Sequence, residues 1–459
     1  MMRKMLLLAV LWGIGVTGSC QSKSAATNAL HQLFREYTEA FEKQGIAARF
    51  SLSYVTNLKH LPQVKKLQQQ KQFFAQYAQK IQAIDQSTLS RNDRYDYTHF
   101  LYEIKRNQEQ VDLQLAFQQQ PLKISKQGMY FLPKGWYAMY VKRMTTSEMS
   151  PQTLMKFGET EVARIKGEIQ QIQDKAGFTG RNEAFYEHLQ SEKFNLYHLD
   201  TVLARYAQID HTVRKNLHRL FEHTEARKVK IKPIPNVNYD SPPGYLIPNR
   251  ATGNTFYFKY YQGKHNWRTM DFLYLHEALP GHSYHFEYEQ LHLKNLPAFH
   301  HLVRYPGFFE GWAAYVENLG KELGLYQNIY TAFGKWSWDL VRSVRIVLDV
   351  GIHHFGWSKK QALDYWKKHL PFRMDIAQRE IDRVTRWPAQ VLSYKLGEAK
   401  LLELKRRCEQ KLGNRFDIRK FHSKVLSKGQ VPLSLMETMV NDFIEDTLHQ
   451  KLSDSKGKG

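Results

Sequence analysis

Cysteine is scarce in this sequence, and long apolar runs are missing after the first twenty residues. The 459-residue chain has two cysteines, Cys20 and Cys408. Two cysteines cannot build a disulfide framework, so stability must come from a hydrophobic core and from any bound metal. After the N-terminus no stretch approaches the roughly 20 apolar residues that a transmembrane helix needs. A content of 42% hydrophobic and 24% charged residues excludes a disordered chain and indicates a globular protein.

Acidic residues are also fewer than basic residues. Lysine and arginine number 66 against 44 aspartates and glutamates, for a formal charge of +22. A strongly basic chain suggests nucleic acid, an anionic membrane surface or an acidic partner. The basic residues are dispersed, however, and the sequence contains no zinc-finger, RRM or homeodomain pattern. We therefore predict a solvated basic surface and no nucleic-acid partner.

The N-terminus has the features of an export signal. Arg3 and Lys4 precede the apolar run 5–16, and small residues 18–19 follow it. Cys20 stands where a lipoprotein signal places its lipidated cysteine, although Thr17 replaces the usual branched aliphatic residue. We predict a signal peptide over residues 1–19 and a lipid anchor on Cys20, with the mature protein in the bacterial cell envelope, facing the periplasm. The alternative is ordinary cleavage nearby without lipidation.

Helical periodicity dominates the rest of the chain. Apolar residues recur at helical spacing, and Ser150-Pro151 and Ser358 to Gln361 have the features of helix starts. The stripes comprise Phe74, Tyr77, Ile81 and Ile84, then Val162, Ile165, Ile169 and Ile172. Prolines punctuate residues 232–262, where 255–261 is strand-like after a Gly253-Asn254 turn. The sequence thus predicts a mainly α fold: a large multi-helix domain enclosing a cleft, with a small β-sheet beside the metal-binding helix.

The predicted organisation has four parts. A signal peptide covers residues 1–19, and a linker with the first helix covers 20–50. One helical domain, with two lobes as an option, covers 51–448, and a disordered tail covers 449–459. The sequence shows no internal repeat, glycine- and serine-rich linker or abrupt charge shift that would mark a further boundary.

The segment His276-Glu277-Ala-Leu-Pro280-Gly281-His282 carries the chemistry. A zinc hydrolase needs imidazole and carboxylate ligands, an open coordination position and a separate carboxylate base. In the common HExxH arrangement the second histidine follows one helical turn after the first. Here it comes six residues later, about 240° around a regular helix, which would separate the two rings. A proline removes the amide that would continue the helix, so we expect a broken turn at Pro280-Gly281 that returns His282 to His276.

The third ligand must come from another helix. Glu310 lies in the otherwise apolar segment 308–317, and Glu317 follows seven residues later on nearly the same face. One of them is expected to bind the metal while the other orients a histidine. We favour Glu310 as the ligand and Glu317 as the acceptor behind it.

These motifs give the sequence a family resemblance. Over roughly residues 50–448 the chain resembles the bacterial domain-of-unknown-function 885 family (DUF885), regarded as zinc metallopeptidases distantly similar to the helical gluzincins. The matching residues are His276-Glu277 with Pro280-Gly281-His282, Glu310 to Ala313 with Tyr315 and Glu317, Arg342, Arg345, Asp349 to His353 with Gly356-Trp357, Glu380, Arg383, Pro388 to Gln390, Ser393 to Lys395 and Gly397. The resemblance implies that His276, His282 and Glu310 bind one zinc ion per chain and that Glu277 is the general base. His285 departs from the pattern, because such proteins often have glutamine there.

Further roles have two readings each. His353 and Tyr394 are candidate catalytic donors to the oxyanion, because similar helical peptidases use a histidine and a tyrosine from the C-terminal half. His353 is equally well explained as a packing histidine bonded to Asp349 or Glu380. Residues Arg342, Arg345 and Arg383 either grip a substrate carboxylate, as in an exopeptidase, or are structural. An Arg345–Asp349 salt bridge is the structural option for that pair.

The sequence therefore predicts a zinc-dependent hydrolase of short peptides in which Glu277 activates a zinc-bound water. Whether it acts as an exo- or endopeptidase stays open, and manganese or cobalt suit similar ligands. The alternatives are a catalytically inactive zinc-binding lipoprotein and a metal-free scaffold of the envelope. Glu277 argues against the first, because a binding site needs no base at that position. Residues 256–261 add a possible edge strand for an extended peptide.

Overall fold

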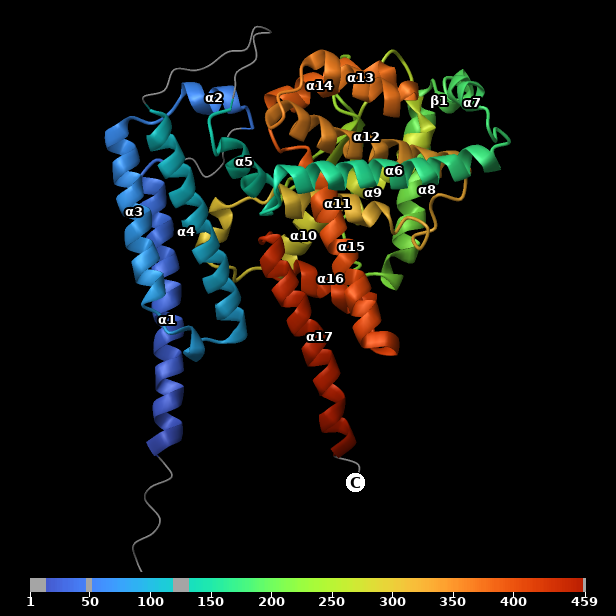
Figure 1. Cartoon of the computed structure of the whole chain (residues 1–459). Coiled ribbons are helices and arrows are strands. Elements are labelled where there is room, and N and C mark those ends of the chain that lie inside the picture. Colours follow the sequence, from blue (N-terminus) through green and yellow to red (C-terminus); the bar gives the residue numbers. More distant parts are fainter. Residues whose placement is uncertain (1–13, 47–51, 119–131, 457–459) are drawn as a thin grey trace, which may run out of the picture. The chain divides into compact units, whose positions relative to one another are not determined.

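A computed structural model of the chain describes the backbone of residues 14–46, 52–118 and 132–456, and the side chains from residue 25 to residue 449 within those ranges (Figure 1). The signal-peptide and lipidation predictions fall on residues 1–19 and on Cys20, whose side chains lie outside that set. Helices dominate and the strands are few and short, which confirms the predicted mainly α fold. In the described part of the chain, no helix combines the length and apolar character of a bilayer span.

The chain forms two compact units. The first comprises Met1–Phe50, Leu61–Gln120 and Asn295–Arg304, and the second comprises Ser51–His60, Pro121–Lys294 and Tyr305–Gly459. The division differs from the predicted boundary at residue 51, because later segments share a unit with the first helix. The final helix includes residues 449–456, which the sequence assigned to a tail.

The first unit is held by an aromatic core. Its helices are α1 (Ile14–Lys43), α3 (Val64–Gln82) and α4 (Arg91–Phe117), with the short turn Ala298–Leu302. Phe74, Tyr77 and Ile81 of α3 are buried, as their helical spacing predicted. The Tyr37 ring of α1 meets the Phe100 ring of α4 edge-on at 4.7 Å between centroids, a favourable aromatic geometry. This unit contains none of the predicted catalytic or metal-binding residues.

The second unit holds every predicted catalytic, metal-binding and substrate-binding residue. Its longest elements are helices, and two small sheets lie among them. The helices are α2 (Tyr54–Lys59), α5 (Trp136–Thr145), α6 (Pro151–Lys175), α7 (Asn182–His188), α8 (Leu199–Asn216), α9 (Met270–Glu277), α10 (His282–His292), α11 (Pro306–Glu317), α12 (Ile329–His353), α13 (Lys359–His369), α14 (Ala377–Arg386), α15 (Leu392–Leu412), α16 (Ile418–Leu426) and α17 (Leu433–Lys456). The strands are β1 (Asn195–Leu196), β2 (Lys230–Pro233), β3 (Gly244–Ile247), β4 (Thr255–Phe258) and β5 (His265–Asn266).

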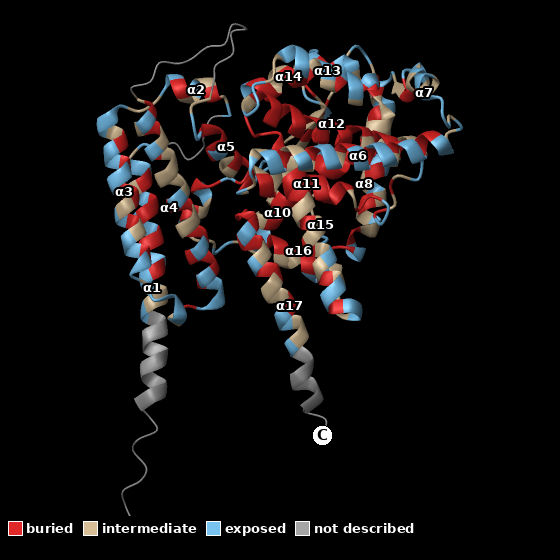
Figure 2. Cartoon of the chain, in the orientation of Figure 1, coloured by how far each residue is buried: buried red, intermediate tan, exposed pale blue. Residues whose placement is uncertain are grey.

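Helix α12 forms the centre of this unit and is buried along most of its length (Figure 2). A helix that is buried all round is usually apolar all round. This one instead carries Lys335, Asp339, Arg342, Arg345 and Asp349, all buried and spaced along one side by three or four residues. Because an unpaired buried charge is very costly, each must have a partner from a neighbouring helix. Helix α12 therefore organises polar interactions in the interior of the unit.

Helix ends and strands follow the sequence signals closely. The Ser150 side chain caps α6, with Pro151 in its first turn, and Ser358 and Gln361 form the expected capping box at α13. The larger sheet has the order β2-β4-β3, with β2 parallel and β3 antiparallel to β4. The prediction of a peptide-binding edge within residues 256–261 is wrong, because β4 has a partner strand on each side and is central.

Candidate metal centre

The predicted break between the two histidines is present. Helix α9 ends at Glu277 and α10 begins at His282, so the histidines occupy the last turn of one helix and the start of the next. Ala278 and Gly281, the residues that flank the break, have non-helical backbone angles. Because the two helices take separate directions, the angular objection that applies to a single regular helix disappears, and the rings of His276 and His282 lie 4.7 Å apart between centroids.

Gly281 allows this turn to fold tightly. A Cβ atom at this position would lie 2.0 Å from the His276 carbonyl oxygen and 2.3 Å from that of Leu275, so only glycine fits against the end of α9. The Trp312 indole nitrogen of α11 donates a hydrogen bond of 3.0 Å to the Pro280 carbonyl. The turn is thereby fastened to the helix that carries Glu310.

Helix α11 itself is positioned by a close approach to α15. A Cβ on Gly311 would lie 2.4 Å from the Gly397 Cα, and a Cβ on Gly397 would lie 1.9 Å from the Gly307 carbonyl oxygen. The two backbones therefore touch where no side chain intervenes. This contact brings Glu310 of α11 and Tyr394 of α15 to the same region of the unit.

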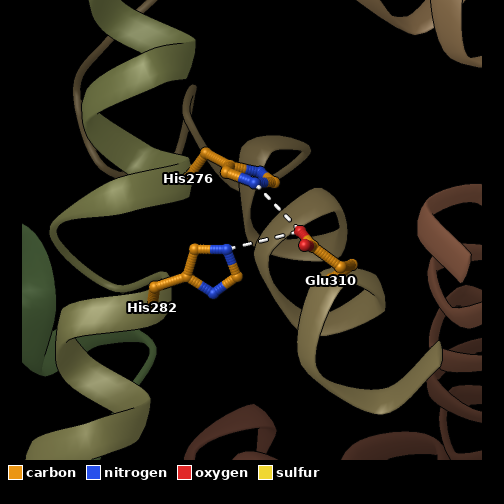
Figure 3. Close-up of side chains that lie close together, drawn as sticks. All are labelled: His276, His282 and Glu310. Atoms are coloured by element: carbon orange, nitrogen blue, oxygen red, sulfur yellow. Dashed lines mark ion pairs between the residues drawn. The ribbon is translucent and has the colours of Figure 1, made fainter. Parts of the chain in front are cut away.

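Three side chains converge in the resulting space (Figure 3). The Nε2 atoms of His276 and His282 lie 3.5 Å and 3.4 Å from the same oxygen, Oε2 of Glu310. One potential ligand atom from each residue lies within 4.8 Å of the others. The His282 ring stacks on Phe309 at 3.9 Å, which fixes its plane. The structure thus brings together the three residues that the sequence selected as metal ligands.

Glu317 lies behind His276 rather than among the ligand atoms. Its carboxylate is 2.8 Å from His276 Nδ1, which leaves Nε2 turned toward Glu310. Arg342 of α12 binds both Glu317 oxygens, at 2.8 Å and 2.7 Å. A carboxylate that fixes the orientation and tautomer of a histidine is the usual partner of a metal-bound imidazole. The geometry agrees with the role predicted for Glu317 and commits Arg342 to it.

Burial shifts the acid–base properties of the histidines and of Glu310. Burial lowers the pKa of His282 to about 4, so its ring is neutral at neutral pH. Burial also opposes the charged form of His276, but the carboxylates of Glu310 and Glu317 raise its pKa to about 9. Although burial disfavours the Glu310 carboxylate, the two histidines hold its pKa well below the usual value.

Glu277 differs from the other carboxylates of the site. Burial raises its pKa to about 7, and the neighbouring Glu310 adds to this effect while His276 opposes it. Among the described residues it has no hydrogen-bond or ion-pair partner within bonding distance. A carboxylate whose pKa lies near neutrality can both accept and release a proton at physiological pH.

The donor set fits a divalent transition metal. Two imidazole nitrogens and one carboxylate oxygen are common zinc ligands, and three protein ligands leave a position open. The side chain of Glu310 is 19% exposed, so solvent or a ligand reaches the cluster of His276, His282 and Glu310 from the Glu310 side. The His282 Nδ1 atom is enclosed and has no hydrogen-bond partner among the described residues. The fit therefore rests on Nε2 of both histidines, with an orienting carboxylate behind His276 only.

His353 contacts other parts of the unit. Its Nε2 lies 2.9 Å from the Val384 carbonyl oxygen, and its ring packs on Tyr54 and Tyr137. Burial lowers the pKa of His353 to about 4. In the described set it contacts none of the cluster residues, and its partner is neither of the acids suggested by the sequence. Asp349 accepts instead from the Tyr137 hydroxyl and the Ala389 amide, at 2.7 Å and 2.9 Å.

Arg345 is a structural ion pair, but its predicted partner was wrong. It binds Glu380 of α14 at 2.6 Å rather than Asp349 one turn along its own helix. Arg379 occupies the other oxygen of Glu380 at 2.9 Å. Glu380 therefore neutralises part of the positive charge on this side of the unit, and two of the three guanidinium nitrogens of Arg345 are engaged with it.

Tyr394 and Arg383 lie beside the cluster. The Tyr394 ring stacks on the His276 ring at 6.2 Å, and its hydroxyl accepts from Arg383 at 3.1 Å. Gln390 accepts from Arg383 at 2.9 Å and directs its amide toward the same hydroxyl at 3.4 Å. Gln390 and Phe309 had no predicted role, because only the fold shows which side chains border the histidines.

Fold and site together define a mainly helical protein with a buried centre of two histidines and one carboxylate, suited to a divalent metal. A profile of a bacterial protein family of unknown function, DUF885, matches residues 127–440, and the chain belongs to this family. A comparison with curated proteins found no match.

Two solved structures share the fold. A candidate lipoprotein from Colwellia psychrerythraea is 25% identical, with a TM-score of 0.64 over 83% of this chain and 69% of that chain. A candidate lipoprotein of unknown function from Shewanella oneidensis is 15% identical, with a TM-score of 0.52 over 83% of this chain and 73% of that chain. The second, at 15% identity, is evidence for the fold alone.

Proposed function

We propose that the protein is a zinc-dependent hydrolase of amide bonds in short peptides. The observation that carries the proposal is the convergence of His276, His282 and Glu310 within 4.8 Å, next to the unpartnered carboxylate of Glu277. A metal-binding role alone explains the three ligands. It does not explain a buried carboxylate beside them that has no hydrogen-bond or ion-pair partner among the described residues.

The chain supplies each group that hydrolysis needs. A zinc ion held by His276, His282 and Glu310 would supply Lewis-acid chemistry, polarising a substrate carbonyl group and making a water molecule more acidic. Glu277 accepts a proton from the attacking water and returns it to the leaving amine. Glu317, held by Arg342, keeps His276 Nε2 turned toward the ligand position.

Tyr394 is the proposed donor to the substrate carbonyl oxygen. Arg383 and Gln390 both donate to its hydroxyl oxygen, and among the described residues no acceptor takes the hydroxyl proton. A tyrosine hydroxyl donates one hydrogen bond, so this donor remains available to a ligand. His353 has no comparable position, and we assign it no catalytic role.

The test combines metal content with hydrolysis. Wild type and Glu277→Gln should each contain about one zinc per chain by mass spectrometry, whereas His276→Ala and His282→Ala should contain little. The matched control is His292→Ala, an exposed histidine of the same helix as His282, which should keep its zinc. Hydrolysis of a short-peptide library should fall about 10²–10⁴-fold in Glu277→Gln, the contribution typical of a general base.

Two results would remove the proposal. If wild type binds zinc but hydrolyses no peptide, or hydrolyses peptides no faster than Glu277→Gln does, the protein would be a zinc-binding protein without the proposed activity. A folded wild type that cannot be loaded with zinc would leave a scaffold, in which His276→Ala lowers stability only.

We also infer that the chain is exported and anchored to the cell envelope through Cys20. The N-terminal signal features and the candidate lipoprotein from Colwellia psychrerythraea, which shares the fold at 25% identity, support this inference. Metabolic labelling with a fatty-acid analogue should mark the wild type and fail to mark Cys20→Ser. Equal labelling of the two would contradict the anchor.

A further inference from the structure

Three arginines face the region of the metal centre, and only one lacks a carboxylate. Arg342 is neutralised by Glu317 and Arg345 by Glu380. Arg383 donates to two neutral oxygens, those of Gln390 and Tyr394, and no described carboxylate lies within 4.0 Å of it. Its Nε atom is enclosed without a hydrogen-bond partner in the described part of the chain. A partly buried guanidinium in this state still has donors to offer.

The arginines around Glu380 carry more positive charge than its single carboxylate balances. Arg345, Arg379 and Arg383 surround the single carboxylate of Glu380, which gives a formal 3 − 1 = +2. Both oxygens of that carboxylate are already taken by Arg345 and Arg379. Arg345 and Glu380 are buried, whereas Arg379 and Arg383 are partly buried. Because water solvates this positive charge only in part, a bound carboxylate would supply charge-assisted hydrogen bonds that water does not.

The position of Arg383 connects it with the metal centre. Its Nη2 atom lies 3.1 Å from the Tyr394 hydroxyl, and the ring of that tyrosine stacks on His276. One tyrosine therefore separates the cation from a metal ligand. An extended peptide advances at most about 3.3–3.6 Å per residue, so we expect one or two residues to bridge the two positions.

Resting on the proposed hydrolase function, we propose that Arg383 binds the C-terminal carboxylate of the substrate, which makes the protein a carboxypeptidase-type enzyme that releases one or two residues. The Gln390 side chain accepts from the same Nη2 atom as Tyr394 and so helps to hold the guanidinium in place. Tyr394 links the two parts of the site, because it accepts from Arg383 and stacks on His276. The guanidinium is suited to this role because its planar donors match the two oxygens of a carboxylate.

The experiment compares N-acetylated tetrapeptide pools that differ only at the C-terminus. One pool ends in a free carboxylate, a second in an amide, and a third in an amide but with an internal glutamate. Binding is measured by ligand-observed NMR with metal-free protein and with zinc-loaded Glu277→Gln, and hydrolysis is measured with zinc-loaded wild type. The variants are Arg383→Gln and Arg383→Lys, with Arg386→Gln as an exposed control on the same helix.

The free-acid pool should bind about 10–100-fold more tightly than the amide pool, as expected for a charge-assisted contact. Arg383→Gln should remove this difference and leave amide binding unchanged, Arg383→Lys should restore part of it, and Arg386→Gln should behave as wild type. Products should be one or two residues long. Thermal unfolding and zinc content identify any variant that fails to fold.

Other outcomes overturn the proposal in different ways. Equal binding of acid and amide, or equal losses for both in Arg383→Gln, would make Arg383 structural. Preference for the internal-glutamate pool would assign the carboxylate to a side chain instead. If acid binding depends on Arg383 in a protein that neither holds zinc nor cleaves peptides, the carboxylate site stands and the hydrolase proposal fails.

Discussion

Two clusters of buried charge share helix α12, and they differ in whether they are complete without a ligand. The lysine network consists of the buried residues Lys335, Asp339, Lys395 and Glu398, together with the partly buried Glu161 and the exposed Arg164 at its edge. Lys395 lies 2.9 Å from both Asp339 and Glu161 and 2.5 Å from Glu398. Three cations face three carboxylates, so the formal charge is 3 − 3 = 0.

The metal centre lacks this balance. Metal ligation requires neutral histidines and ionised carboxylates. In that state Glu277, Glu310 and Glu317 carry three negative charges, and Arg342 is the one arginine or lysine among the described residues in ion-pair contact with them, so the formal charge is 1 − 3 = −2. The histidine nitrogens of the cluster face a carboxylate oxygen at 3.4–3.5 Å, beyond the usual hydrogen-bond distance. A network that satisfies itself serves packing, whereas a buried cluster with excess negative charge and free imidazole nitrogens is suited to a divalent cation.

The largest expected effect comes from a substitution that breaks the lysine network, the cluster whose charges already balance. Lys395→Met should lower the free energy of unfolding by about 3–5 kcal/mol, because it leaves Asp339 and Glu398 short of a buried partner. Chemical denaturation measures this loss, and the zinc content of folded protein should be unchanged. Lys405→Met on the same helix removes only a surface pair and should cost below about 0.5 kcal/mol. A loss under about 1 kcal/mol in Lys395→Met would show that the network is not a stability element.

The next largest effect is expected when zinc is added to the metal centre, the cluster whose charges do not balance. Zinc at about 1,000 times its dissociation constant should stabilise the wild type by about 4 kcal/mol, because it binds the folded state only. A chelator should reverse the gain in thermal unfolding. His282→Ala should gain nothing from zinc, while His292→Ala should respond as wild type does. Equal stabilisation of His282→Ala would place the metal elsewhere.

A smaller effect should distinguish the proposed metal ligand Glu310 from Glu317, the carboxylate that orients His276. Glu317→Gln should weaken zinc binding by about 10–100-fold, the usual cost of changing a group behind a histidine ligand. Competition with a fluorescent chelator measures the affinity. Glu310→Gln is the matched comparison and should lose zinc much more completely. The opposite order would exchange the roles of the two glutamates.

The smallest effect concerns His353, which belongs to neither cluster. Its pKa of about 4 lies below the ordinary value of 6.5. As the pH falls, the histidine is therefore protonated in the unfolded chain before it is protonated in the folded protein. Stability from the neutral ring is present above pH 6.5 and is lost as the pH falls toward 4. His353→Gln keeps a donor for the Val384 carbonyl and should flatten the stability profile in this window by at most about 1.4 kcal/mol per pH unit.

Other groups around His353 also affect how stability depends on pH. Tyr54 and Tyr137 face its ring, and Asp349, with a pKa raised by burial to about 7, binds Tyr137. Asp349 acts with the opposite sign, because its protonated form stabilises the fold at low pH. The difference between wild type and His353→Gln isolates the histidine. A loss of hydrolysis in His353→Gln above about 10-fold would instead return it to the catalytic residues.

Local signals in the sequence determined much of this protein. Helical spacing, caps and the Pro280-Gly281 break follow from near neighbours in the chain, and they predicted a mainly α fold with His276 and His282 brought together. The chemistry of a zinc site, supported by family resemblance, then selected Glu310 and Glu317. These features needed no knowledge of which helices pack together.

Only the tertiary structure decided which partner each buried charge takes. Glu310 and Glu317 lie on nearly one helix face, and the approach of α11 to α9 and α12 separates their roles. Arg345 pairs with Glu380 across helices rather than with Asp349, and β4 is central rather than an edge. The reason is physical: a buried charge is stabilised by whatever lies within a few ångströms, and distance along the chain does not reveal that neighbour. The same reason left Arg383 without a carboxylate, which only the packing of α14 against its neighbours shows.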